Sequence, residues 1–168
     1  MTDRTANLLG VLGLAVADRI EDIARDILGR VGETPAALVV LGHGTGLSND
    51  GLRRILRLSH PGTVRLVDRL VADGLVERGE GKDRRAVALR LTEQGQSIRD
   101  KLLQGRLSAL DALLVPLSEQ ERELFNGLLG KILISMDTTV SDRRTLCRLC
   151  DVQVCSDCPI PASEGRAA

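Results

Sequence analysis

Aromatic side chains are almost missing from this sequence of 168 residues, which has one Phe and no Trp or Tyr. Leu, Val, Ile and Ala must therefore form the core, and any pocket must be lined by aliphatic side chains. Long apolar runs are missing too: no window of roughly 18 apolar residues exists, so we expect no membrane span. The N-terminal apolar patch lacks a clear small-residue cleavage site, and we expect a cytoplasmic protein without a signal peptide.

The groups that most enzymes need are also scarce. The chain has two histidines, and none of its four cysteines lies near either of them in the sequence. There is no Gly-rich phosphate loop and no identifiable pair of carboxylates in a cleft. We therefore expect that the protein is not an enzyme.

The formal net charge is zero, but the charge is unevenly distributed. Residues 52–90 contain ten Arg or Lys and five Asp or Glu, which gives this segment a charge of +5 and leaves −5 for the remainder. A basic middle on a neutral chain is typical of a module that binds a polyanion. Charge alone, however, favours the simpler explanation, a solvated surface without a partner.

The first 74 residues show four helical segments with recognisable ends. Apolar residues at helical spacing predict a helix over 6–30 that ends at Gly32. Thr34 and Pro35 predict the start of a second helix, which the glycines at 42, 44 and 46 end. Ser48 and Ser59 are expected to cap a third and a fourth helix. The fourth has an apolar stripe and ends at Gly74; the stripe consists of Thr63, Leu66, Val67 and Leu70.

After residue 74 the apolar period changes from helical to alternating. "LVER" and "AVALRL" flank a Gly-rich charged loop, which predicts a β-hairpin with an exposed tip. Thr92 starts a long helix over 92–114, which Pro116 breaks. Ser118 caps a last helix to about residue 138, with Glu121 completing a capping box. The end after Cys158 is expected to be unstructured.

The third and fourth helices, joined by a short turn, are typical of a helix-turn-helix that places its second helix in the DNA major groove. Arg65 can form two hydrogen bonds with a guanine edge, and His60 and Thr63 can reach bases or phosphates. The hairpin then supplies a wing for phosphates or the minor groove. The predicted DNA-binding residues are His60, Pro61, Gly62, Thr63, Arg65, Arg69, Lys82, Arg84 and Arg85.

The stretch "LRLSHPGTVRLVDRLVADGLVERGEGKDRRAVALRLTEQG" resembles the winged-helix core of MarR-family transcription regulators. The resemblance extends over about residues 6–140. It implies a mainly α fold with a small β-wing, and a homodimer formed by the N- and C-terminal helices. It also implies a regulator of pseudo-palindromic double-stranded DNA, most often a repressor, released by a small-molecule effector or by oxidation. By position, Asp83 would brace the wing and Arg85 would approach DNA.

This comparison divides the chain into five parts. Residues 1–33 form an N-terminal dimerisation helix, 34–91 the DNA-binding domain, and 92–140 the C-terminal dimerisation helices. Residues 141–160 form a four-cysteine tail and 161–168 a disordered end. The alternative is a winged-helix protein-interaction module without sequence-specific DNA binding. The operator, the regulated genes, the effector and the sign of regulation are not encoded in any recognisable motif.

The tail holds every cysteine of the chain, at the spacing C-x2-C-x4-C-x2-C: Cys147, Cys150, Cys155 and Cys158. In a cytosolic chain two C-x-x-C pairs indicate a metal site, and four thiolates satisfy tetrahedral zinc. Arg143, Arg144 and Arg148 would offset the negative charge of such a centre. An iron–sulfur cluster that senses redox state or nitric oxide is the first alternative, and a metal-free thiol switch is the second. Because the tail follows the last helix, we expect this centre on the dimerisation helices.

Overall fold

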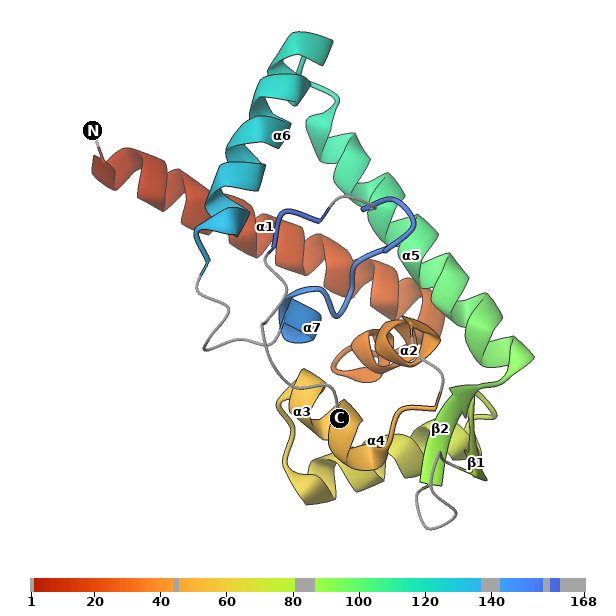
Figure 1. The fold of residues 1–168 in the computed structure, drawn as a ribbon. Helices are drawn as coiled ribbons and strands as arrows, with labels where there is room; N and C mark the ends of the chain where they lie inside the picture. Colours follow the sequence, from red (N-terminus) through yellow and green to blue (C-terminus); the bar gives the residue numbers. More distant parts are fainter. Residues whose placement is uncertain (1, 44–45, 81–86, 137–142, 156–157, 161–168) are drawn as a thin grey trace.

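The computed structural model of the chain describes residues 2–43, 46–80, 87–136, 143–155 and 158–160. These residues form a mainly helical protein with one small antiparallel sheet, which confirms the predicted fold class (Figure 1). In chain order the described elements are α1 (Thr2–Leu28), α2 (Thr34–His43), α3 (Asn49–Leu56), α4 (His60–Ala72), β1 (Val76–Glu80), β2 (Val87–Leu91), α5 (Glu93–Leu114), α6 (Glu119–Ile134) and α7 (Arg143–Leu146).

The helix-turn-helix is formed by α3 and α4, and both predicted caps are present. The Ser48 hydroxyl accepts from the Gly51 N–H at 3.1 Å, and the Ser59 hydroxyl accepts from the Gly62 N–H at 3.2 Å. Each bond satisfies an N–H that the first helical turn leaves without a backbone partner. Between the helices Arg57 has a φ of 54°, a left-handed conformation that turns the chain sharply into the next cap.

The hydrophobic core lies between α2 and the helix-turn-helix. From Thr34 to Leu41 every residue of α2 is buried, because this helix is apolar on all sides and is covered on all sides. It packs against aliphatic side chains from α3, α4 and β2, including Leu52, Val67 and Leu89. No aromatic side chain belongs to this core, as the composition predicts.

The wing is the hairpin of β1 and β2, paired from Val76↔Leu91 to Glu80↔Val87. A third segment joins it, because the Leu89 N–H donates to the Leu47 carbonyl at 2.8 Å. The chain between α2 and α3 is therefore hydrogen-bonded to the wing. The predicted hairpin is confirmed, while its tip, residues 81–86, lies outside the described residues.

Helix α5 begins in close contact with the base of the wing. Thr92 caps it, accepting from the Gly95 N–H at 3.0 Å, as the sequence predicts. A side chain at Gly95 would place its Cβ only 2.0 Å from the Leu75 carbonyl oxygen. Only glycine allows this approach, so Gly95 fixes the distance between the long helix and the DNA-binding unit.

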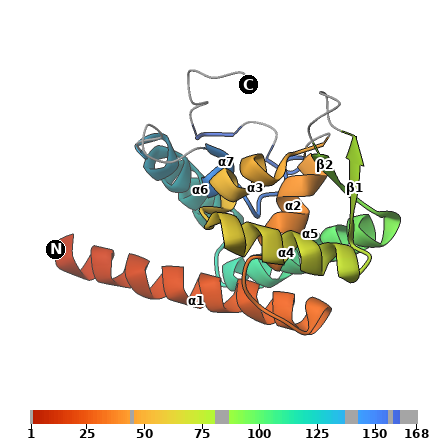
Figure 2. The same cartoon turned by 90° about the horizontal axis from the view of Figure 1, so that it is seen from below.

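The long helices α1, α5 and α6 form the other half of the chain. The C-terminal part of α1 packs on α5, where Ile23 contacts Gly105, whereas the N-terminal part extends away from the rest of the chain (Figure 2). Helix α6 begins with the predicted capping box of Ser118 and Glu121 and buries none of its residues. Both helices therefore carry apolar side chains that this single chain leaves exposed.

Some predicted ends differ from those observed. Helix α1 ends at Leu28, before Gly32, because Gly29 already adopts a φ of +66° and its N–H donates to the Arg25 carbonyl. Helix α6 ends at Ile134, before residue 138. The chain past Cys158 was expected to be unstructured, yet Ile160 is buried; residues 161–168 lie outside the described residues. None of the helices in the described part of the chain has the length and the hydropathy of a membrane span.

Candidate nucleic-acid interface and four-cysteine cavity

The exposed face of α4 carries the predicted DNA-contacting side chains. His60, Pro61, Arg65 and Arg69 are exposed, and Gly62 is half-buried at the start of the helix. The opposite face, with Leu66, Val67 and Leu70, is buried in the core. The helix is therefore held by one face while the other presents two arginines to solvent, which is the arrangement that major-groove recognition needs.

Thr63 does not belong to this exposed face, contrary to the prediction that it contacts DNA. Its side chain is 1% exposed, and its hydroxyl donates to the Ser59 carbonyl at 3.1 Å. It lies three residues before Leu66 and four before Val67, so helical periodicity places it on the inward stripe. The prediction of Thr63 as a DNA contact is wrong, and its membership of the apolar stripe is confirmed.

The wing is tied to the recognition helix by an ion pair. Arg78 on β1 donates to the Asp68 carboxylate on α4. This contact orients the hairpin relative to α4, a role that sequence spacing could not reveal because it links two elements across space. The predicted wing residues Lys82, Asp83, Arg84 and Arg85 lie outside the described residues, and their roles stay predictions.

Not all of the basic charge is available for a polyanion. On α3, Asp50 accepts from Arg53 at 2.9 Å and pairs with Arg54 at 2.7 Å. The hydrogen bond from Arg53 lowers the pKa of the Asp50 carboxyl, with both arginine charges adding to the effect. Both cations thus have an acidic partner, and Arg65 and Arg69 are the better candidates for DNA contact.

The C-terminal segment returns to the DNA-binding helices, which the sequence did not predict, and it also contacts the dimerisation helices α1 and α5. The short helix α7 packs against α3, and Leu149 contacts the core between α1, α2 and α5. Between this segment and α2–α3 lies a cavity of about 450 Å³. All four cysteines line it, together with Val40, Leu47 and Ile55 from the DNA-binding unit.

The thiols interact across the two C-x-x-C pairs. Cys147 lies within hydrogen-bonding reach of Cys158, and Cys150 within reach of Cys155. Burial and the neighbouring thiols raise the pKa of Cys147, and they raise that of Cys150 to about 11. Burial also acts to raise the pKa of Cys158, but the Ile160 N–H and the Arg143 guanidinium outweigh it and lower that pKa. Arg143 is therefore in place to offset thiolate charge, as predicted.

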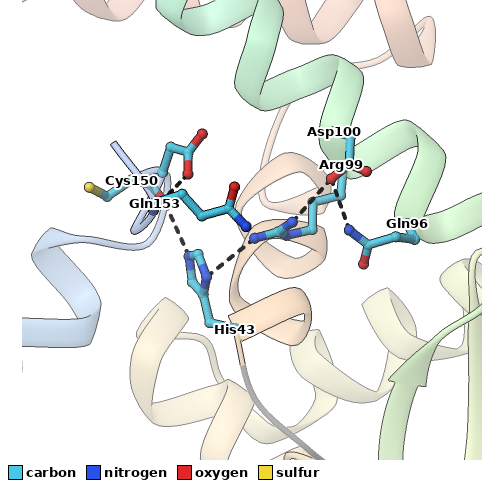
Figure 3. A network of polar contacts seen from close by, with 7 residues as sticks. His43, Gln96, Arg99, Asp100, Cys150 and Gln153 are labelled. Carbon is cyan, nitrogen blue, oxygen red and sulfur yellow. Dashed lines mark hydrogen bonds and ion pairs between the residues drawn. The ribbon is translucent and has the colours of Figure 1, made fainter. Parts of the chain in front are cut away.

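His43 connects this segment to α2 and α5 (Figure 3). Its Nε2 lies 3.1 Å from the Cys150 carbonyl, which can only accept, so Nε2 carries the proton. Its Nδ1 then accepts from Arg99 Nη2 at 3.3 Å. Burial lowers the pKa of His43, and the positive charge of Arg99 lowers it further, which favours this neutral ring. Gly42 permits the contact, since a Cβ there would lie 2.1 Å from Arg99 Nε.

The fold and the exposed face of α4 define a winged-helix protein of the DNA-binding class. Residues 32–86, which span the segment from α2 to the wing, match the model of the MarR family. The chain is 25% identical over 95 residues to the uncharacterized HTH-type transcriptional regulator YwhA of Bacillus subtilis (strain 168), covering 56% of this chain and 68% of that one. It is 31% identical over 68 residues to the HTH-type transcriptional repressor YetL of the same organism, covering 40% and 41%.

Solved structures agree with the sequence comparisons. The structure of a MarR family protein from Bacillus stearothermophilus is 29% identical, with a TM-score of 0.65, and the match covers 79% of this chain and 95% of that one. The chain therefore has the MarR winged-helix fold. Because regulators of this family are DNA-binding proteins rather than enzymes, the expectation that the chain is not an enzyme is confirmed.

Proposed function

We propose that the chain is a transcription regulator, acting as a repressor, that binds a pseudo-palindromic DNA duplex as a homodimer. One observation carries this proposal: α4 buries one face in the core and presents Arg65 and Arg69 from the other. The matched family and the repressor YetL support the direction of regulation. The alternative is a protein-interaction module, in which these arginines would be ordinary surface side chains, and the salt dependence below distinguishes the two.

Exposed apolar side chains on α1 and α6 support the dimer. Along α6 they recur one helical turn apart at Leu124, Leu128 and Ile132, and along α1 at Leu8 and Leu12. Full burial of an exposed Leu or Ile contributes about 1.5–3 kcal/mol, and these side chains are about half exposed, so each would contribute about half of that. Two copies of both helices together still have ample apolar surface for association. A dimer would place two α4 helices about 34 Å apart, one turn of the duplex.

The test of DNA binding starts from a duplex selected by the protein from a randomised library. Affinity is measured by fluorescence anisotropy at several salt concentrations, with Arg65→Ala and Arg25→Ala as matched variants. Arg25 is exposed on α1 and paired with Asp22, so its loss should leave DNA affinity unchanged. Loss of a bidentate contact by Arg65 should weaken binding by about 1–3 kcal/mol and relax specificity at one base position.

The salt dependence of binding distinguishes a DNA-binding regulator from a protein-interaction module. The logarithm of the association constant should fall linearly with the logarithm of salt concentration, by about 0.9 for each phosphate contacted. If affinity does not depend on salt, or if Arg65→Ala and Arg25→Ala behave alike, α4 is not the recognition helix.

The dimer is tested separately by analytical ultracentrifugation. Leu128→Glu should shift the protein towards monomer, because it places a charge within the proposed apolar interface. Val87→Glu alters an apolar side chain that is similarly exposed on the wing, and it should leave the mass unchanged. A wild-type protein that sediments as a monomer at micromolar concentration contradicts the proposed assembly.

A further inference from the structure

The four cysteines line one cavity, although they come from two separate C-x-x-C pairs. Within the sequence the pairs are Cys147 with Cys150 and Cys155 with Cys158, whereas the close contacts join Cys147 to Cys158 and Cys150 to Cys155. The second pair has therefore folded back over the first. Two hydrogen-bonded turns support this return. The Cys150 N–H donates to the Cys147 carbonyl at 2.9 Å, and the Cys155 N–H donates to the Asp151 carbonyl at 3.1 Å.

We propose that these four thiols bind one zinc ion, and that the bound ion couples the C-terminal segment to the DNA-binding helices and sets the affinity for DNA. The inference about affinity rests on the function proposed above, while the metal site itself does not. Zinc fits a closed set of four sulfurs, because a structural zinc site is tetrahedral and accepts thiolate ligands.

Local charge suits such a centre. Four thiolates and one Zn²⁺ carry a formal charge of about −2, which needs cationic neighbours when it is removed from bulk water. The Arg143 guanidinium interacts with both Cys158 and Cys147, and Arg144 lines the same cavity. Val40 of α2 and Ile55 of α3 line the cavity, so the sulfurs are shielded from solvent on that side.

Binding would require a movement of the segment. As placed, the described residues contain no group of three His, Cys, Asp or Glu side chains arranged to hold a metal ion. Each Zn–S bond is about 2.3 Å long, so the two thiol pairs must close on a common point inside the cavity. The segment that moves includes Cys150, whose carbonyl accepts the hydrogen bond from His43.

His43 transmits this movement in two directions. It lies at the end of α2, within the DNA-binding unit, and its Nδ1 accepts from Arg99 on α5. The Arg99 side chain is only 12% exposed and also pairs with Asp100, so it is fixed in position (Figure 3). A shift of Cys150 therefore changes how the end of α2 sits against α5. His43 is thus a positioning residue and not a zinc ligand.

The metal site is tested on the full chain purified without oxygen. Elemental analysis should give one zinc per chain, and titration against a chelating indicator should give the affinity. Co²⁺ in place of zinc should show the absorption of tetrahedral thiolate coordination. Cys150→Ser and Cys158→Ser should each weaken binding at least tenfold, with their fold checked by circular dichroism. A protein without bound metal, or one with the visible absorption of an iron–sulfur cluster, overturns the zinc assignment.

The coupling is tested by comparing the zinc-loaded and chelated wild type. Their affinities for the selected duplex should differ at least about fivefold, the lower end of measured coupling between sites. Zinc should also slow hydrogen exchange at the end of α2 and in α3. His43→Ala should retain one zinc per chain but lose most of the difference in DNA affinity and the protection of α2. His60→Ala, which removes the other histidine, should keep that protection.

The outcomes separate this inference from the proposed function. Equal DNA affinities of the loaded and chelated forms, with zinc bound, overturn the coupling. If neither form binds any duplex, the proposed function fails, and zinc stoichiometry with the exchange protection of α2 still decides the site. If zinc binding leaves hydrogen exchange at the end of α2 unchanged, the proposed coupling through His43 is overturned.

Discussion

Replacing Gly95 with alanine should destabilise the protein, although alanine is the better helix former. Gly95 lies in the first turn of α5, where its N–H donates to the Thr92 hydroxyl. A Cβ at this position would lie 2.0 Å from the Leu75 oxygen and 2.9 Å from its carbonyl carbon. This is roughly 1.3 Å inside the closest usual carbon–oxygen contact of about 3.3 Å. The start of α5 or the base of the wing must therefore move.

The size of the effect follows from opposing contributions. Overpacking of this kind costs about 1–3 kcal/mol. The Leu75 carbonyl also accepts from the Thr92 N–H at 3.1 Å, and weakening this bond costs up to about 1 kcal/mol. The higher helix propensity of alanine stabilises the variant by about 1 kcal/mol. We expect a net loss of about 2 kcal/mol in the free energy of unfolding.

The assay is urea unfolding at a fixed protein concentration, because association makes the apparent stability depend on concentration. Gly127→Ala is the matched control: it lies inside α6, and nothing lies within 4 Å of its added Cβ. This control should be stabilised by up to about 1 kcal/mol. A Gly95→Ala protein as stable as the wild type would show that α5 and Leu75 are not in contact, and the reasoning would be refuted.

Three further predictions concern single side chains. Thr63→Val should cost about 1 kcal/mol of stability, because a hydrogen bond to Ser59 is lost, while titration with the selected duplex shows unchanged affinity; a loss like that of Arg65→Ala would restore Thr63 as a DNA contact. Arg78→Ala should lower DNA affinity severalfold by freeing the wing, with less than about 1 kcal/mol change in stability because the ion pair is exposed; unchanged affinity would show that the wing needs no brace. Ser118→Ala should cost about 1 kcal/mol in thermal unfolding at neutral pH. Hydrogen bonds from the Ser118 N–H and from its hydroxyl lower the pKa of Glu121, and alanine removes only the second. The stability that the hydroxyl contributes through this carboxylate is present above the unfolded pKa of Glu121 and lost as pH falls through the folded one, so a pH-independent difference between Ser118→Ala and the wild type would contradict this.

Local signals in the sequence predicted most of the described fold. The caps at Ser48, Ser59, Thr92 and Ser118 were identified correctly because each depends on atoms within three residues along the chain. The buried stripe of α4 was identified for the same reason, since helical periodicity alone places it. Gly29 shows the limit of this reasoning: two glycines follow one another closely, and local sequence does not state which ends the helix.

The candidate site was predicted less completely, because parts of it depend on contacts between distant segments. The sequence indicated that the cysteines act together and that Arg143 offsets their charge, but it did not indicate that they return to α2 and α3. The roles of His43 and Arg99 depend on that return, and the brace between Arg78 and Asp68 depends on the packing of the wing. Thr63 was assigned both to the apolar stripe and to DNA, and a single side chain in a helix cannot face both.

The hydrogen bond from Leu89 to Leu47 has a consequence for any motion of the DNA-binding unit. Leu47, in the connection between α2 and α3, pairs with β2 of the wing through one isolated bridge, so a displacement of the end of α2 would also act on the hairpin. While this bond and the Arg78–Asp68 ion pair are both in place, we expect the recognition helix and the wing to move together. In the proposed dimer, an allosteric signal would alter the distance between the two winged-helix units. The base preference of each unit would stay the same.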